Sequence, residues 1–420
     1  MLAFIAYAGL ISAGASPAWV GLQTPTNQKP ATNEAGPAIQ APATTQTSLT
    51  PAEQKDQERH EADVKSDIEE GKKYAAEAEK QYKLSTNKEY IDRVTRIGAD
   101  IAAIANSNKI IALWGDKHFS KFDYVYKVIQ GDDVNAFSLP GGHIYVFEGL
   151  MKQIESDDEL AGVLGHETAH AALRHVATLE HDQEKLMTVS IPALLAAILI
   201  GARTQTYNSG PNIAVPGIQS LMQMTESGWS VNAEKAADYG GFQYLLKSKY
   251  DPSGMLTFME RMAQDERLGI AFDWGIYRDH PPGKERAEAL AKEMADAGLP
   301  LRRSKVTTTY RVTMKPSDNG KIQLSFGTRP LIALGGTDAI NRADKMVPAL
   351  NSFFDSTPEM FEVQAGPNGT ITWNGQPIIT ITPDDVLGTS LSVSGLRDQT
   401  LQSVRMSLFN LGFHVWASHT

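Results

Sequence analysis

The sequence contains no cysteine among its 420 residues. This absence excludes disulfide bonds, thiolate metal ligands and cysteine nucleophiles, and it also excludes lipid attachment through an N-terminal cysteine. Basic residues are outnumbered, because 39 Lys and Arg stand against 49 Asp and Glu, which gives a formal net charge of −10. Nucleic-acid binding needs clustered basic side chains for the phosphates. We therefore expect no nucleic-acid partner.

The N-terminus has no basic residue before Lys29, and residues 1–20 are almost wholly apolar. A signal peptide has a basic start, an apolar centre and a small-residue cleavage site, and the last two are present here. We predict a signal peptide over residues 1–18, cleaved near Ala15 or Ala18, and export to the periplasm or cell envelope. The alternatives are an uncleaved anchor that keeps the protein membrane-associated, or a start codon assigned too late.

No run beyond the N-terminus reaches the roughly 20 apolar residues that span a bilayer. The most apolar one, residues 186–202, is shorter and contains Pro192. We interpret it as a core or surface-docking helix. The alternative is a segment that dips into the membrane, and residues 186–202 would then provide peripheral membrane contact.

The length favours two folded units plus irregular parts. Residues rich in Thr, Gln, Pro and Ala indicate a disordered linker, which we assign to 19–60. A solvated helix is expected from Ala52 to about Lys83, overlapping the end of this linker. We assign a first domain to 61–303 and a second to 304–420.

Periodic apolar positions place the elements of the first domain. One helical face is formed by residues at spacings of three and four: Tyr90, Val94, Ile97, Ile101 and Ile104. Strands are expected at 121–129 and 143–147. Further helices are predicted at 157 to about 184, 230–248, 252–265 and 283–297.

The second domain has a different pattern. Strands are expected at 307–314 and 321–326, and the dipeptides Asn368-Gly369 and Asn374-Gly375 predict hairpin turns. A final amphipathic helix is marked by Leu401, Val404, Leu408 and Leu411. We predict a small α+β module of unknown role.

The run His166-Glu167-Thr168-Ala169-His170 lies in the helix predicted from residue 157. Residues four apart lie on the same helix face, so both imidazoles are presented to one point. A zinc ion needs this geometry from two of its ligands. Glu167 is placed to take a proton from a metal-activated water and to deliver it to a leaving amine.

A catalytic zinc site needs a third protein ligand. His175 lies nine residues after His166, about 180° around a helix, so we expect it to point away and to pack or face solvent. Glu234 is the better candidate, and Asp238, four residues later, shares its helix face. The alternative is a solvated Glu–Asp face on a charged helix, which these residues alone favour. Asp238 could accept a hydrogen bond from a ligating imidazole, as such ligands usually require.

Several motifs in chain order resemble those of metallopeptidase family forty-eight, the gluzincin family of HtpX-like, Oma-like and CAAX prenyl proteases, and the soluble envelope members most of all. The resemblance covers about residues 69 to 300. Its motifs are Gly71-Lys72, Tyr90 to Val94, Asn135-Ala136-Phe137, Pro140-Gly141-Gly142, His166 to His170, Glu234 to Asp238, Tyr250-Asp251-Pro252, His280-Pro281-Pro282 and Arg286.

The resemblance implies a mainly helical, gluzincin-type zinc metallopeptidase domain with a small sheet, so the whole chain is predicted to be α+β. One Zn²⁺ per chain would be held by His166, His170 and Glu234. Glu167 would be the base and Asp238 would orient a ligand, while His280 and Arg286 would approach the active site. His280 would either occlude the metal or act in catalysis. Val231 stands where family members often have Arg, so any role of that Arg is in doubt here.

The resemblance also implies how substrate binds. An edge strand between Asn135 and Phe147 would pair with an extended peptide, and we name its substrate-binding residues as Asn135, Ala136, Phe137, Gly141 and Gly142. The predicted reaction is peptide hydrolysis, and the predicted substrates are misfolded envelope proteins. The alternatives are a membrane-embedded protease of the same chemistry and a chaperone-like protein that binds clients without cleaving them.

Overall fold

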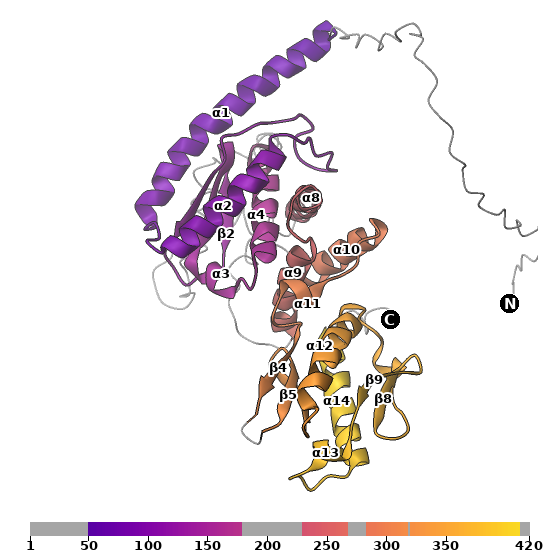
Figure 1. The fold of residues 1–420 in the computed structure, drawn as a ribbon. Coiled ribbons are helices and arrows are strands. Elements are labelled where there is room, and N and C mark those ends of the chain that lie inside the picture. Colours follow the sequence, from indigo (N-terminus) through magenta and orange to yellow (C-terminus); the bar gives the residue numbers. More distant parts are fainter. Residues whose placement is uncertain (1–48, 179–228, 268–282, 318–319, 412–420) are drawn as a thin grey trace, which may run out of the picture. The chain divides into compact units, whose positions relative to one another are not determined.

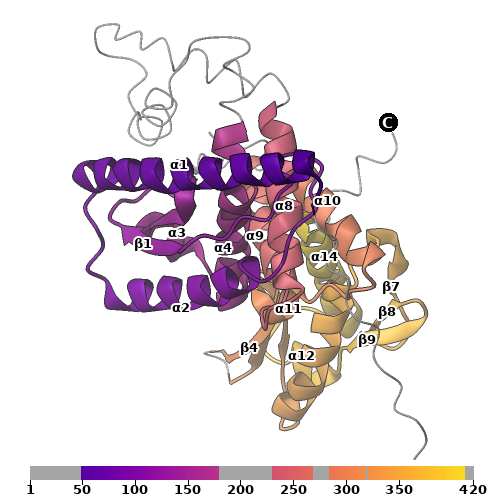
Figure 2. The ribbon, with the colours of Figure 1, turned by 90° about the horizontal axis from the view of Figure 1, so that it is seen from above.

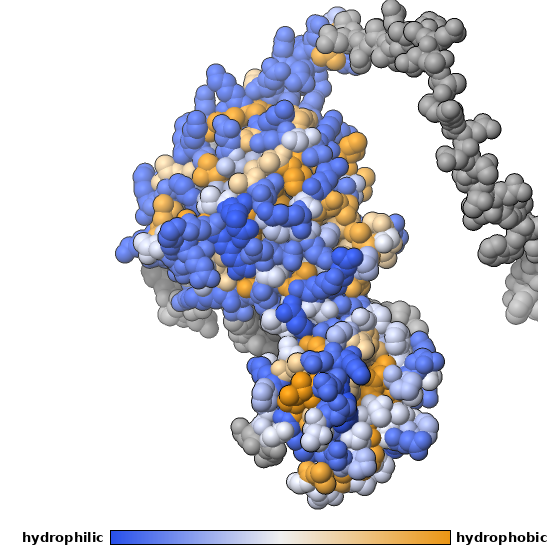
Figure 3. Space-filling model, in the orientation of Figure 1, coloured by the Kyte–Doolittle hydropathy of each residue, from blue (hydrophilic) through white to orange (hydrophobic). Residues whose placement is uncertain are grey.

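The structure is a computed structural model that describes residues 49–178, 229–267, 283–317 and 320–411 (Figure 1). The predicted signal peptide and the apolar run at 186–202 lie outside these residues. Among the helices within them, none is long and apolar enough to cross a membrane. The face seen in Figure 3 is mostly hydrophilic, with hydrophobic residues scattered over it.

Helix α1 (Pro51–Gln81) is the first element of the described chain. It begins inside the predicted linker, so the prediction of disorder is wrong for residues 51–60. The prediction of a solvated helix is wrong for one of its sides, where His60, Gly71 and Ala78 are buried. Gly71 is needed where it stands, because a Cβ atom there would lie 1.9 Å from the carbonyl oxygen of Pro140.

The first sheet has three strands, β1 (Val125–Ile129), β2 (Ala136–Leu139) and β3 (His143–Phe147), in the order β1-β3-β2. Strand β3 pairs parallel with β1 and antiparallel with β2. The strand predicted at 121–129 is present as β1, but it begins only at Val125. The predicted edge strand is two strands, of which β2 is an edge and β3 is central.

Helices cover both faces of this sheet. Ala75, Ala78 and Tyr82 of α1 and its end pack against Tyr145 and Phe147 on one face. The other face meets α2 (Lys88–Ala105), α3 (Glu148–Gln153) and α4 (Asp157–Ala172), which share the larger core. Figure 2 shows α1 and α2 on opposite sides of β1. The apolar face predicted for α2 is confirmed, since Val94, Ile97 and Ile101 are fully buried.

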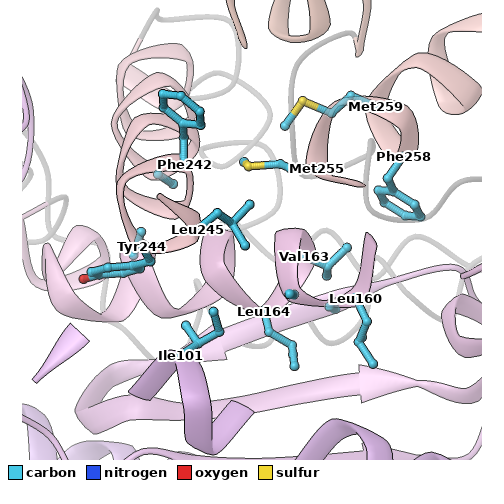
Figure 4. Packing of buried hydrophobic residues seen from close by; sticks show 14 of the residues in the cluster. Ile101, Leu160, Val163, Leu164, Phe242, Tyr244, Leu245, Met255, Phe258 and Met259 are labelled. Carbon is cyan, nitrogen blue, oxygen red and sulfur yellow. The ribbon is translucent and has the colours of Figure 1, made fainter. Parts of the chain in front are cut away.

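Three more helices pack beyond α4, namely α8 (Trp229–Leu245), α9 (Ser253–Arg267) and α10 (Gly283–Asp296). They confirm the predicted helices to within a few residues at each end. Leu160, Val163 and Leu164 of α4 face side chains of α8 and α9 such as Leu245 and Met255 (Figure 4). The core of the first domain therefore lies around α4, which carries the histidine pair.

Helices α4 and α8 approach each other closely through glycine. A Cβ atom on Gly241 would lie 2.9 Å from the backbone nitrogen of His166, and one on Gly240 would lie 2.7 Å from the Cβ atom of Ala169. Real side chains do not tolerate such distances, so no larger residue fits here without moving a helix. This contact sets how near the side chains of α8 come to the histidines of α4.

The second domain contains two antiparallel meanders, each followed by a long helix. The elements are α11 (Arg303–Val306), β4 (Val312–Pro316), β5 (Ile322–Phe326), β6 (Arg329–Leu334), α12 (Ala339–Asp355), η3 (Met360–Glu362), β7 (Val363–Ala365), β8 (Thr370–Trp373), β9 (Gln376–Thr380), α13 (Pro383–Val386) and α14 (Val393–Leu411). The final amphipathic helix is confirmed as α14. The hairpin at Asn374-Gly375 is also confirmed, with positive φ at both residues. The strand predicted from residue 307 begins only at Val312.

Polar contacts link the residues around the predicted boundary at 303/304 to the first domain. Arg303 and Glu260 form a buried pair with Nη2 and Oε1 2.6 Å apart, and Glu155 accepts hydrogen bonds from the backbone of Thr309 and the hydroxyl group of Thr308. Residues 52–420 form one compact unit. The domain boundary at 303/304 remains a prediction.

We predict that Gly241→Ala destabilises the protein by about 1–3 kcal/mol, because an overpacked helix contact must open. Ala is otherwise the better helix former by about 1 kcal/mol, so the sign of the change is informative. Urea denaturation measures the free energy of unfolding, with Lys235→Ala on the exposed side of α8 as the control. A stabilised Gly241→Ala variant would contradict the close contact.

Candidate functional site

Helix α4 begins at a strong N-terminal signal and is buried along most of its length. The side chain of Ser156 accepts a hydrogen bond from the backbone of Glu159, which satisfies one of the open donors of the first turn. Asp157, Asp158 and Glu159 add negative charge where the helix dipole favours it. The helix therefore holds its later residues, including His166 and His170, in fixed positions.

The two histidines and Glu234 bring together three side chains that could hold a metal ion. The Nε2 atoms of His166 and His170 lie 3.0 Å apart. Each lies 3.3 Å from one carboxylate oxygen of Glu234. His166 and Glu234 are buried, and the side chain of His170 is 13% exposed. Three possible metal-ligand atoms from α4 and α8 thus lie close to one another.

Asp238 and Arg286 surround this group on the side of His166. Asp238 Oδ1 lies 2.9 Å from His166 Nδ1, and Arg286 donates two hydrogen bonds to Asp238, of 2.7 and 2.8 Å. Arg286 Nη1 also lies 3.4 Å from Glu234. Burial raises the pKa of Asp238, but the charge of Arg286 and the hydrogen bond with His166 outweigh it and hold the pKa at about 2.

The imidazoles respond differently to their surroundings. Burial lowers the pKa of His166, but hydrogen bonds with Asp238 and Glu234 outweigh it and raise the pKa to about 9. Burial lowers the pKa of His170, and the attraction of Glu234 does not restore it. The two histidines of the motif are therefore electrostatically distinct.

Glu167 is almost fully buried, with 1% of its surface exposed. Its Oε1 atom has no hydrogen-bond partner in the part of the chain that the structure describes. Leaving a buried carboxylate oxygen unpartnered is unfavourable. Such an atom is accounted for if the folded protein binds another molecule, such as water or a substrate, beside it.

His175 does not point away from the site, so the helical-wheel expectation is wrong. Helix α4 ends at Ala172, and not near residue 184 as predicted. Arg174 then adopts a left-handed conformation with φ of 51° before the chain turns helical again from His175 to Thr178. This turn brings His175 Nδ1 to 2.9 Å from His170 Nδ1. The prediction that His175 is a packing residue agrees with its burial.

This donor set fits a zinc ion. Zinc accepts two imidazoles and one carboxylate in catalytic sites and keeps one further position open. Each ligating histidine should donate its other ring nitrogen to a neighbouring acceptor, and Asp238 and His175 stand at these places for His166 and His170. The residues present can therefore hold the predicted cofactor.

The predicted substrate-binding residues lie on and beside β2. Gly141 and Gly142 have φ of 74° and 87° and are buried in the turn η1 (Pro140–Gly142). The side chain of Phe137 packs on Tyr145 and Phe147, on the face that α1 covers. Ala136 is buried in the larger core.

The carbonyl oxygen of Asn135 accepts a hydrogen bond from the backbone of Phe147. These side chains are therefore not gathered at the metal-binding group, and contact with substrate would fall to the backbone of β2. His280 lies outside the described residues.

A second cluster of histidine and carboxylate groups connects α1 with the loop after α2. Asp116 lies 3.1 Å from His60 Nδ1 and 2.8 Å from His118 Nδ1. The two rings stack at 4.4 Å between centroids. Arg174 already binds Asp116 at 2.7 Å. We interpret this cluster as an ion-pair network.

Sequence reasoning missed Arg174 and the close contact made by Gly240 and Gly241. The pair Gly240-Gly241 inside a predicted helix was a usable signal, because glycine inside a helix often marks close packing. The break after Ala172 has no comparable signal, since Leu173 and Arg174 are both good helix formers.

A protein-family model described as "Peptidase family M48" matches residues 107–294. This match confirms the family resemblance that the motifs indicated, together with the α+β fold expected from it.

Individual proteins are similar to parts of this chain. The metalloprotease LoiP of Escherichia coli (strain K12) is 31% identical over 178 residues, which are 41% of this chain and 64% of that protein. The mitochondrial metalloendopeptidase OMA1 of Schizosaccharomyces pombe is 32% identical over 193 residues, 45% of this chain and 51% of that protein. The beta-barrel assembly-enhancing protease of Yersinia pestis is 25% identical over 167 residues, 39% of this chain and 31% of that protein. The chain thus spans about a third to two thirds of the length of these relatives.

We predict that the purified protein binds about one zinc ion per chain, and that His166→Ala, His170→Ala and Glu234→Ala each lose most of it, because each removes one of three ligands. Asp238→Asn should weaken metal affinity roughly 10–100-fold. Elemental analysis and chelator competition measure both effects. Asn232→Ala, on the exposed side of α8, is the control. Full metal content in Glu234→Ala would mean that the third ligand is another residue.

Proposed function

We propose that the protein is a zinc-dependent endopeptidase, because residues 107–294 match the model of peptidase family M48. One observation carries the proposal. The donor atoms of His166, His170 and Glu234 converge next to Glu167, a buried carboxylate with an unpartnered oxygen within the described chain. A protein that only binds clients has no need of such a carboxylate beside a metal site.

The residues of the site have separate roles in peptide hydrolysis. The zinc ion, when bound, supplies a Lewis acid that activates water and polarises the peptide carbonyl. Glu167 takes a proton from the attacking water and gives it to the leaving amine. Asp238 holds His166 in the orientation that directs its Nε2 atom at the metal position.

Arg286 has a supporting role in this proposal. It holds Asp238 in place and adds positive charge 3.4 Å from Glu234. A guanidinium group at this distance from the ligands also favours the negative charge that develops on a peptide carbonyl oxygen during attack. We therefore assign Arg286 to the active site.

The substrate would bind as an extended peptide along β2. This strand pairs with β3 on one side only among the described strands, so its other edge offers backbone groups for pairing. A small pocket is lined both by Ser138 and Leu139 of β2 and by His170. A peptide on the edge of β2 would therefore run past the metal-binding group.

A second, small pocket is lined mainly by apolar side chains. It reaches His166 and is lined by Met255, Phe258, Met259 and Met262 of α9. Methionine side chains adapt to differently shaped partners. We propose that the enzyme accepts varied apolar segments, which misfolded proteins expose and folded ones bury.

We also propose that the protein acts on misfolded or misassembled proteins of the cell envelope. Two observations support this location, namely the apolar residues 1–20 and the relative in Yersinia pestis that is named a beta-barrel assembly-enhancing protease. The second domain, residues 304–420, has no assigned role in this proposal.

We predict that Glu167→Gln keeps its zinc and lowers cleavage of unfolded casein by roughly 10²–10⁴-fold, the usual contribution of a general base. Glu89→Gln, an exposed change on α2, is the matched control. Zinc content is measured on the same samples. Wild-type protein that binds zinc and casein but leaves casein intact would support the client-binding alternative instead.

We predict that export is followed by cleavage near residue 15 or 18, since the apolar start has the small residues that signal peptidases require. N-terminal sequencing of the protein purified from its native cells measures this. A soluble cytosolic species that still begins at Met1 or Leu2 would remove the envelope location, and with it the proposed substrates, without affecting the metal site.

A further inference from the structure

The chain takes an unfavourable backbone conformation directly after the helix that carries the histidine pair. Arg174 has φ of 51°, in the left-handed region where a Cβ atom is crowded. Such residues persist only where the surroundings hold them, and they gather at functional sites. We therefore asked which contacts hold this turn and what the turn positions.

Two carboxylates hold the turn. Arg174 donates from Nε and Nη2 to both oxygens of Asp67 on α1, at 2.5 and 3.1 Å, and from Nη1 to Asp116 at 2.7 Å. The Arg174 and Asp67 side chains are each 9% exposed. A paired guanidinium with three charge-assisted hydrogen bonds is a strong anchor. Asp116 is itself fixed by the backbone of His118.

The consequence of the turn is the position of His175. Its Nδ1 atom lies 2.9 Å from Nδ1 of His170, and its ring packs against Trp114 at 4.9 Å between centroids. A hydrogen bond between two such nitrogens needs a proton on one and a lone pair on the other. His170 presents Nε2 to Glu234, so a metal there takes the lone pair of Nε2 and leaves the proton on Nδ1.

We propose that His175 is a positioning residue for the metal ligand His170, whose Nδ1–H group donates to the Nδ1 atom of His175. This inference rests on the proposed function, because it needs a metal ion held by His170. His175 is not itself a ligand in this arrangement. Its Nδ1 atom faces the ring nitrogen of His170 that lies away from Glu234.

The two ligating histidines would then be oriented by different acceptors. Asp238 is a carboxylate and lies 2.9 Å from His166, whereas His175 is an imidazole and adds no negative charge. A second carboxylate in this place would be buried near Glu234, and like charges repel each other. A neutral acceptor orients His170 without this repulsion.

His175→Asn and His175→Leu test the proposal. Asn and Leu have nearly the same size, and only Asn places an acceptor oxygen where Nδ1 of His175 now lies. Chelator competition on the full chain measures zinc affinity. We expect His175→Leu to weaken it roughly 10–100-fold, as for other partners of metal-bound histidines, and His175→Asn to stay within a few-fold of wild type.

The possible results distinguish the positioning role of His175 from the proposed function. Equal affinity in wild type and His175→Leu overturns the positioning role, and an equal loss in both variants shows that only packing matters. Wild-type protein that binds no zinc refutes the proposed function instead. If His175→Leu does not fold, ¹⁵N-histidine spectra of zinc-loaded wild type decide. A coupling between the two Nδ1 nuclei is expected, and its absence overturns the proposal.

Discussion

The close contact of α4 and α8 is the constraint on which the site depends. Gly241 lies against the backbone of His166 and Gly240 against Ala169, so the two helices lie nearer to each other than helices with larger contact residues. At this spacing the carboxylate of Glu234 reaches both imidazoles at 3.3 Å. A wider spacing would leave two histidines and a carboxylate as separate buried polar groups, which is an unstable arrangement.

The charges of the site explain why a divalent cation suits it. Glu167, Glu234 and Asp238 are buried, and Arg286 is the guanidinium that contacts two of them. Among the described residues of this site, three carboxylates thus stand against one guanidinium, and negative groups are in excess. Burying such an excess is costly without compensation. A bound Zn²⁺ would cancel it, whereas the metal-free protein draws a proton onto His166, whose pKa is raised to about 9.

The sequence predicts well those features that depend on the geometry of a single helix. The apolar period predicted α2, and the four-residue spacing predicted that His166 and His170 share a face, because both patterns depend only on helix geometry. Pairings between distant segments were harder to predict. The central place of β3 depends on β1 and β2 meeting it from both sides, and no local pattern encodes that order. That Glu234 is the nearby carboxylate followed from helix-face spacing combined with the family resemblance.

The wrong prediction for His175 shows where a helical wheel fails. The 180° estimate assumes that the helix continues, and Leu173 and Arg174 favour that locally. The chain turns because Asp67 and Asp116, far away in sequence, bind the guanidinium group of Arg174. Tertiary ion pairs thus override local propensity at this position. The same ion pairs connect α1 to the end of α4, so a helix that begins inside the predicted linker contributes to the placing of His175 against His170, the proposed metal ligand.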